Sequence, residues 1–441
     1  MLRAELPGTL DLFALHRQAP QRYPFLLESV AGHPLAGRYD LLFAFPGEAL
    51  EAGRAGLDHA GFFDALSSGF DAARCAPAHG LPFCGGWFLL LGYEAARGVE
   101  ARLHLPDSPH RLPDALAVRC TAAVIVDRET RRTVLIAEQD PEQLRQLQAD
   151  CEAAAPATSM DNSPLLAAIE EDPEERFLHG VEAILQYLHA GDVFQVNLSR
   201  AWRGRLRAGT GYVELYQRLR RANPAPFAGL ARWRDSAVLS SSPERLVAIE
   251  GGIVQTRPIA GTHARLADPQ EDARQRAGLL ASLKERAEHL MLIDLERNDL
   301  GRVCVPGSVE VSELMCIESY AHVHHIVSNV RGRLRAGVGP GQVLRAVYPG
   351  GTITGCPKVR AMEIIAELEG VGRGPYTGAM GYLSRCGCMD SNILIRSLVC
   401  EGEQVSFRAG AGIVADSQPL AELAETRAKA RGLLRALGAE A

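Results

Sequence analysis

The sequence predicts an α+β fold in which antiparallel strands cluster between helices. Short apolar runs bounded by glycine and proline, such as 39–45 and 86–92, are typical of strands. Segments 140–155 and 173–189 have helical length and periodicity, with Gly191 placed to end the second. Strands and helices do not alternate strictly, which disfavours a doubly wound sheet. Further strands are expected at 122–127, 192–198, 237–241, 246–249, 252–258, 377–384, 393–400 and 404–408, and long helices at 271–297 and 418–437.

Composition narrows the class of protein. The 441 residues are 47% hydrophobic and 23% charged, with a net charge of -6, which is ordinary for a globular protein and argues against a nucleic-acid binder. We find neither an apolar run of the roughly 20 residues that span a bilayer nor an N-terminal export signal. A cytoplasmic protein without a membrane or nucleic-acid partner is therefore expected.

The ten cysteines are scattered along the chain, which predicts reduced and mostly buried thiols. Cys386 and Cys388 are separated by one residue, whereas zinc knuckles typically separate their cysteines by two. No second Cys/His pair lies near them in the sequence, so no zinc site is expected.

A segment at 153–170, which begins with small and turn-forming residues, is expected to be a linker. It divides an N-terminal region, 1–152, from a C-terminal region, 171–441.

The C-terminal helix carries acidic residues at helical spacing. Glu422, Glu425 and Lys429 fall within a sector of about 60°. The apolar residues expected on the other side are Leu420, Leu423, Ala424 and Leu434. Spacing alone indicates a solvated charged face.

The segment 284–299 has the same character. Glu285 and Glu288 share a helix face, whereas Ala287, Leu290 and Met291 face elsewhere. Two such acidic faces that met would suit Mg²⁺, a hard ion that prefers carboxylate oxygens. Spacing does not show whether the two helices meet.

Three other features do not decide a function by themselves. The turn at 349–358 precedes an expected helix at 359–368 and is either a tight turn or an anion site. Glu244 follows a strand and is either a general acid, if burial raises its pKa, or a turn carboxylate paired with Arg245. His324 and His325 are adjacent, so only one can face a given side of a strand.

Taken together and in order, seven motifs resemble the chorismate-utilising enzyme family. They are Phe194–Leu198, Ser242–Arg245, Arg257–Thr262, the helix at 284–299, Gly350–Glu363, Met389–Asp390 with Ile395–Arg396, and Ala409–Ser417. The resemblance implies one large α+β unit of two facing antiparallel sheets surrounded by helices. It assigns chorismate binding to 171–441.

The resemblance also implies roles for single residues. Glu288 and Glu425 match magnesium ligands, with Glu285 and Glu422 behind them, and Glu244 matches the acid that protonates the departing C4 hydroxyl. His325 is expected near the reacting carbon. The residues expected to bind the substrate are Arg396, Lys429, Tyr382, Thr352, Gly410, Ala411 and Gly412, with the Thr262 hydroxyl completing the cradle.

Gln195 separates the branches of this family. The water-using isochorismate and salicylate synthases resemble one another in having lysine here, and glutamine cannot act as that base. The resemblance therefore implies ammonia as the nucleophile. Amine-using family members typically receive it from a separate glutamine amidotransferase, so a partner subunit forming a heterodimer is expected.

Ala260 makes the expected product ambiguous. Aminodeoxychorismate synthases of the family that carry a lysine nucleophile have it at this position, whereas anthranilate synthases carry alanine. Leu26–Ser29 resembles the tryptophan-site motif of anthranilate synthases, which makes Leu27, Glu28 and Ser29 a candidate aromatic amino-acid pocket.

The compact chain and the segments 323–325, 351–355 and 268–272 favour the aminodeoxychorismate branch. The first expectation is therefore 4-amino-4-deoxychorismate, for 4-aminobenzoate and folate biosynthesis. The alternatives are formation of anthranilate with release of pyruvate, and a non-catalytic family member that binds an aromatic ligand.

Overall fold

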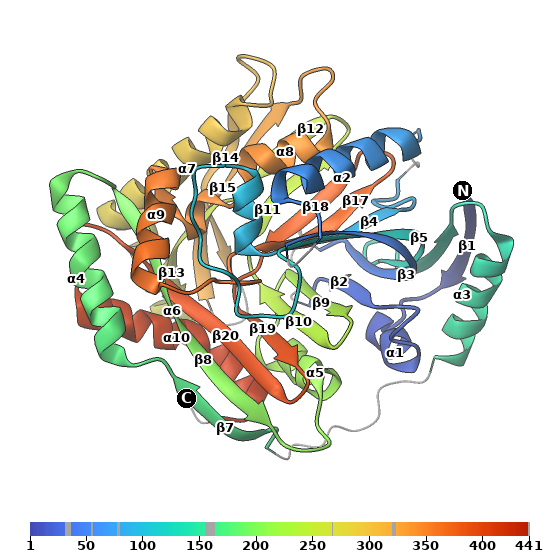
Figure 1. Cartoon of the computed structure of the whole chain (residues 1–441), viewed down its shortest axis with the longest axis horizontal. Helices are drawn as coiled ribbons and strands as arrows, with labels where there is room; N and C mark the ends of the chain where they lie inside the picture. The colour runs from blue at the N-terminus through green and yellow to red at the C-terminus, as the bar shows by residue number, and fades with distance from the viewer. Residues whose placement is uncertain are drawn as a thin grey trace.

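The computed structural model describes residues 1–30, 37–53, 56–76, 80–154, 164–266, 268–319 and 323–439. All pairings between its strands are antiparallel, and they join the strands into one continuous network. Figure 1 shows the strands running through the middle of the molecule with helices on the outside. The predicted α+β class is confirmed.

The strands are β1 (Leu2–Pro7), β2 (Phe25–Glu28), β3 (Tyr39–Ala52), β4 (Gly86–Leu91), β5 (Ala115–Asp127), β6 (Arg132–Ala137), β7 (Leu166–Glu171), β8 (Gln195–Leu206), β9 (Phe227–Trp233), β10 (Ser236–Ser242), β11 (Arg245–Glu250), β12 (Ile253–Thr256), β13 (Ile259–Ala264), β14 (Glu310–Ser319), β15 (Val323–Arg333), β16 (Gly355–Cys356), β17 (Ala379–Ser384), β18 (Met389–Ile393), β19 (Ser397–Glu401) and β20 (Gln404–Ile413).

The helices are α1 (Leu12–Gln18), α2 (His59–Ala73), α3 (Pro141–Ala153), α4 (Glu174–Ala190), α5 (Tyr212–Ala222), α6 (Pro269–Ala281), α7 (Leu283–Gly301), α8 (Pro340–Val347), α9 (Lys358–Glu369) and α10 (Pro419–Leu437), with short 3₁₀ turns at Tyr93–Gly98 and Gly351–Ile353. None of the described helices is both long and apolar enough to cross a membrane.

The N-terminal and C-terminal regions share the sheet. β2 pairs with β9, and β4 pairs with β17, so strands from both regions are hydrogen-bonded neighbours. In Figure 1 the blue strand β4 accordingly lies beside the orange strand β17. Of the expected linker, 155–163 lie outside the described residues, and its C-terminal part forms β7, which pairs with β8. The two regions therefore build one structural unit.

Two expected element boundaries were wrong. The single helix expected at 271–297 is two helices, because Ser282 ends α6 and its hydroxyl accepts the Glu285 N–H as the N-cap of α7 (3.3 Å). The single strand expected at 393–400 is interrupted at Arg396, whose φ of 51° does not fit a strand. By contrast, Gly191 ends α4 in the left-handed conformation, as expected, with φ 80°.

The buried faces of α7 and α10 also differ from expectation. Leu290 is 50% exposed and Leu420 is 72% exposed, and Ala424 is exposed as well. The acidic residue Glu422 is instead buried, next to Leu423. Glu285 and Glu288 on α7 are partly buried as well, whereas Glu425 is exposed. An isolated helix would not favour burying these carboxylates, and their burial indicates a functional constraint.

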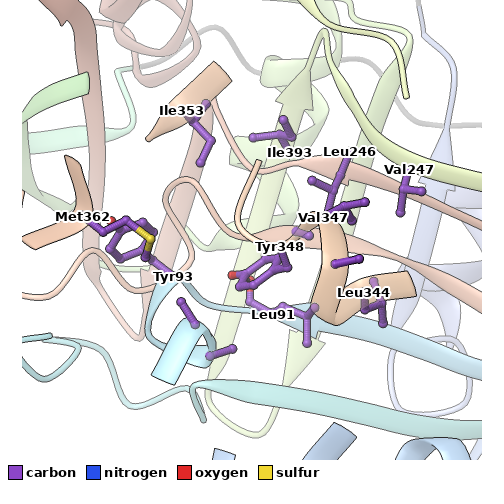
Figure 2. Packing of buried hydrophobic residues seen from close by; sticks show 14 of the residues in the cluster. Leu91, Tyr93, Leu246, Val247, Leu344, Val347, Tyr348, Ile353, Met362 and Ile393 are labelled. Carbon is purple, nitrogen blue, oxygen red and sulfur yellow. The ribbon is translucent and has the colours of Figure 1, made fainter. Parts of the chain in front are cut away.

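A large apolar core packs beneath this part of the molecule. Figure 2 shows Tyr348 lying between Leu91 on one side and Leu246 and Val347 on the other. The Tyr348 hydroxyl donates a hydrogen bond to the Gly92 carbonyl oxygen (2.6 Å), so its polar end is satisfied within the core. This core supports the 349–358 turn and the start of α9.

Candidate active site

Glu244 lies in the turn between β10 and β11 and is 4% exposed. Burial raises the pKa of its carboxyl to about 7, although the Thr352 hydroxyl, the Ile259 backbone and the charges of Lys429 and Arg396 oppose that shift. A carboxyl with this pKa can donate a proton near neutral pH.

The turn itself is held rigidly. The Ser242 hydroxyl donates to the Ile393 carbonyl oxygen (2.6 Å) and accepts from the Glu244 N–H (3.2 Å). Arg245 donates two hydrogen bonds to Asp390, both of 2.9 Å. The alternative in which Glu244 is neutralised by Arg245 is therefore wrong, and Glu244 is left available to a substrate.

Arg396 is held by the segment between β18 and β19, where its carbonyl oxygen accepts the Ser241 N–H (3.1 Å). Burial lowers the pKa of its guanidinium, while the charge of Glu244 opposes this. No described side chain forms an ion pair or hydrogen bond with this guanidinium. Arg396 is half-buried, and a half-buried cation without a protein partner is suited to a carboxylate ligand, which arginine binds in a bidentate way.

The second cation of the site comes from α10. Lys429 Nζ donates to the Gly410 carbonyl oxygen on β20 (3.0 Å) and forms an ion pair with Glu425 (2.7 Å). Ala411 is fully buried in the core, so only its backbone can face a ligand. The predicted contribution of residues 410–412 is thereby limited to backbone groups and to the space beside the glycines.

Gln195 lies opposite β20, at the start of β8. Its Nε2 would be 2.5 Å from a Cβ at Gly412, so a side chain at that position would displace the end of Gln195. Its Oε1 is buried and accepts no hydrogen bond from any described residue. The same is true of Asn197 Oδ1, two residues along the strand and so on the same face. The site therefore presents two unused amide acceptors.

The acidic faces of α7 and α10 meet. Burial raises the pKa of Glu288 to about 7, and the nearby carboxylates of Glu285, Glu425 and Glu422 raise it further, against the charge of Lys284. Burial and the charge of Glu425 likewise raise the pKa of Glu422. Sequence spacing could not establish this meeting. No group of three or more His, Cys, Asp or Glu side chains in the described ranges is arranged to hold a metal ion.

The turn at 257–262 lies between α7 and the strand β15 that carries His325. Gly261 has φ 67° and lies against α7, where a Cβ would be 2.7 Å from Glu285 Oε2. Ala260 is buried (8% exposed) on β13, next to a register shift in its pairing with β15. Thr262 pairs with His325, but its side chain lies outside what the structure describes.

The two histidines point to different surroundings. His325 Nδ1–H donates to the Gly261 carbonyl oxygen (3.4 Å), and burial, together with the charge of Arg396, lowers its pKa to about 3, so the ring is neutral. His324 instead contacts Asp272 (2.9 Å) and Ser319 (2.7 Å). Only His325 is therefore placed beside the site.

Tyr382 lies elsewhere, which corrects the prediction that it lines the Glu244 pocket. Its ring contacts Phe43 and Phe83, and it lines a separate cavity of about 1320 Å³ together with Leu27 and Glu28. The reason is strand parity, because Tyr382 faces the same side of β17 as the buried Met380.

The predicted aromatic amino-acid pocket is at that cavity. Leu27 and Glu28 line it, whereas Ser29 is buried next to it and donates its N–H to Asp40 (2.8 Å). Glu28 accepts hydrogen bonds from Tyr216 (2.6 Å) and Arg220 (2.9 Å). The ligand of this cavity stays a prediction.

Several polar residues near Glu244 were not anticipated from the sequence. Burial raises the pKa of Glu296 to about 8, and the charge of Asp299 adds to this. Asp299 also accepts a hydrogen bond from Lys358 Nζ (2.5 Å). The Tyr376 hydroxyl would be 2.8 Å from a Cβ at Gly410. Their burial in the folded chain, rather than any local pattern, reveals them.

A neutralisable acid, two cations and a facing set of carboxylates define an enzyme site for a small anionic substrate. The model for the chorismate binding enzymes matches residues 49–435, and the chain belongs to this family. Aminodeoxychorismate synthase component 1 of Klebsiella aerogenes is 44% identical over 361 residues, which cover 81% of this chain and 78% of that protein.

Anthranilate synthases are similar to a comparable degree. Component 1 from Streptomyces coelicolor is 40% identical over 447 residues, covering 95% of this chain and 84% of that protein. The crystal structure of anthranilate synthase component I from Streptococcus pneumoniae superposes with a TM-score of 0.80 at 32% identity, over 91% of this chain and 93% of that one. The expected family and fold are confirmed, and the protein is a chorismate-utilising enzyme.

Proposed function

We propose that this enzyme aminates chorismate at C4 and forms 4-amino-4-deoxychorismate for 4-aminobenzoate and folate biosynthesis in the cytoplasm. The observation that carries the proposal is the Glu244 carboxyl, buried with a pKa of about 7 and within reach of the charges of Arg396 and Lys429. Two cations suit the two carboxylates of chorismate, and a protonated acid suits a hydroxyl leaving group.

The chemistry follows from these positions. Arg396 and Lys429 bind and orient the carboxylates, and Glu244 donates its proton to the C4 oxygen as the C–O bond breaks. Ammonia forms the new C–N bond, and the proton that it loses returns to the site. Overall, the C4 hydroxyl is replaced by an amino group, one ammonia is consumed and one water is released. Because Ala260 offers no nucleophile, attack on C4 occurs without a covalent link to this position.

Ammonia is favoured over water by the groups opposite β20. Gln195 cannot remove a proton from water, but its unused Oε1 accepts a hydrogen bond from an N–H. The name "component 1" of the similar synthases suits a subunit that works with another. We therefore include in the proposal a glutamine amidotransferase partner that supplies the ammonia.

Mg²⁺ is also part of the proposal. Carboxylate oxygens are ligands that suit a hard dication: Glu288 and Glu425 would hold it, with Glu285 and Glu422 behind them, and its charge would offset the burial and the nearby carboxylates that raise the pKa of Glu288. Bound there, the ion would neutralise a substrate carboxylate and orient the ring.

Anthranilate synthase is the second candidate, favoured by Ala260 and by the similarity to the Streptomyces protein. A non-catalytic binder of an aromatic ligand is the third. The proposed chemistry can be tested with the purified chain, chorismate and Mg²⁺, with ammonium supplied in place of a partner subunit. An aminated product is expected. Isochorismate would overturn the assignment of ammonia as the nucleophile, and absence of turnover, even with glutamine and amidotransferases, would support the third candidate.

A further inference from the structure

Four cysteines that are far apart in the sequence meet at one end of the β4–β17 pair. Cys75 follows α2, Cys84 precedes β4, and Cys386 and Cys388 lie in the turn between β17 and β18. The sulfurs of Cys75 and Cys84 are 3.5 Å apart. The sulfurs of Cys84 and Cys386 are each 3.2 Å from the Ser384 hydroxyl, which lies between them. The expectation that the cysteines are scattered holds for the sequence but not for the fold.

The backbone places Cys84 opposite Cys386. Gly86 pairs with Ser384 in the antiparallel ladder, and the Arg385 N–H donates to the Gly85 carbonyl oxygen (2.9 Å), which continues the pairing by one residue. The next pair in this register is Cys84 and Cys386. Cβ atoms of directly opposed residues are typically about 4.5–5.5 Å apart, and a disulfide needs about 3.5–4.5 Å. A small adjustment therefore suffices to join them.

The electrostatic setting favours reaction at Cys386. Thiols of Cys388 and Cys84 and the Ser384 hydroxyl donate to its sulfur, which lowers the pKa of Cys386 below its usual range. The pKa of Cys84 is raised, because this thiol is hydrogen-bonded to Cys386 and is partly buried. Cys386 is half-buried and lines the 1320 Å³ cavity, so a small oxidant can reach it. Cys120 and Cys400 are buried, and burial raises the pKa of each thiol to about 12.

We propose that Cys84 and Cys386 are a site of reversible oxidation by a peroxide and form a disulfide that links β4 to the β17–β18 turn. The Cys386 thiolate attacks one oxygen of hydrogen peroxide, the O–O bond breaks, and hydroxide leaves the sulfenic acid behind. The Cys84 sulfur then attacks the Cys386 sulfur, the S–S bond forms, and the S–O bond breaks. Two thiols and one peroxide become one disulfide and two waters.

The disulfide would fix one wall of the cavity that holds Leu27 and Glu28. The β17–β18 turn contributes Cys386, Gly387 and Cys388 to the lining of that cavity, and Leu81, close to Cys84 in the sequence, lines it as well. The site lies apart from Glu244 and Arg396, so the inference does not depend on which product the enzyme forms.

Other pairings in the cluster are less favourable. Cys386 and Cys388 are held in a turn closed by the hydrogen bond from Ser384 N–H to the Cys388 carbonyl oxygen (2.8 Å), which a bond between them would distort. Cys75 contacts Cys84, but its sulfur is not the one that the neighbouring groups activate. The described thiols are not arranged to hold a metal ion.

The test uses the full-length reduced protein, treated with hydrogen peroxide and mapped by mass spectrometry without reduction. We expect two of the ten thiols to be lost, a peptide linking Cys84 to Cys386, and full reversal by dithiothreitol. Cys386→Ser should abolish the linked peptide, whereas the matched variant Cys400→Ser, at a buried thiol outside the cluster, should retain it.

Several results would overturn the proposal. A disulfide between Cys75 and Cys84 that leaves Cys386 free would show that the proposed pair is wrong. A zinc ion retained by the purified protein that protects these thiols from peroxide would show a metal site instead. Because the first measurement is made on the unmodified chain, a folding defect in Cys386→Ser would not prevent the decision.

Discussion

Glu244 and Arg396 lie in one buried site, where burial shifts the pKa of each side chain toward its neutral form. The carboxyl is raised to about 7 and the guanidinium is lowered, although each charge partly restores the other. A substrate carboxylate bound to Arg396 would therefore arrive next to an acid that still holds its proton. This relationship supports a leaving group that departs with proton donation.

Glu244→Gln should remove the proton donor while preserving the shape of the site. We expect chorismate turnover to fall by about 100- to 10,000-fold, the range typical of general acid catalysis, with little change in chorismate binding. Steady-state kinetics and calorimetric binding would measure the two effects. Glu182→Gln, an exposed change on α4, is the matched control, and equal losses in both variants would contradict the role of Glu244.

Gly412→Ala should impair activity more than stability. The added Cβ would be 2.5 Å from Gln195 Nε2, and this flexible side chain can move away from the site. At least a tenfold loss of kcat/KM is expected, with the melting temperature nearly unchanged. Gly301→Ala is a suitable control because a Cβ there meets nothing within 4 Å. Full activity in Gly412→Ala would show that the position of Gln195 is not critical.

Glu288→Gln should raise the Mg²⁺ concentration needed for half-maximal activity or abolish activation altogether. The variant removes one expected ligand charge from the site where α7 and α10 meet. Activity titrations with Mg²⁺ after chelator treatment would measure this, with Glu182→Gln again as the control. An unchanged Mg²⁺ dependence would remove Glu288 from the expected ligands.

The free energy of unfolding should decrease as pH rises from 6.5 to 8. Folded Glu296 keeps its proton up to a pKa of about 8, whereas the unfolded carboxyl has lost it above about pH 5. The folded state therefore binds more protons, and its stability declines by up to about 1.4 kcal/mol per pH unit from this group. His325, with its lowered pKa, opposes this slope at the lower end of the range, where the unfolded imidazole with its pKa of about 6.5 still binds protons.

Glu296→Gln should make that slope shallower, since the amide imitates the neutral acid. Urea unfolding at several pH values in the presence of a chelator would measure it. A slope equal to that of the unmodified protein would mean that Glu296 is ionised in the folded state.

The sequence was sufficient for the fold class and for the family because the motifs are local. The strand before Glu244, the turn at 257–262 and the helix start at 358 can each be recognised from neighbouring residues. The break at Ser282 could not, since both halves have helical composition and only the cap separates them. The interruption of the expected strand at Arg396 could not be predicted either, because its positive φ is a property of the folded backbone and not of the residue type.

Residues that depend on long-range packing were the ones missed or misplaced. Tyr382 was assigned to the wrong face because strand parity depends on the register with β4 and β18. Asn197 is recognisable only once β20 is known to lie opposite it. The meeting of Cys84 with Cys386 depends on a pairing that no local spacing encodes.

The product formed from chorismate tests the central claim most directly. The purified chain, supplied with chorismate, Mg²⁺ and ammonium, should accumulate an aminated product that gives 4-aminobenzoate only after an aminodeoxychorismate lyase is added. Direct formation of anthranilate with release of an equal amount of pyruvate would contradict amination at C4.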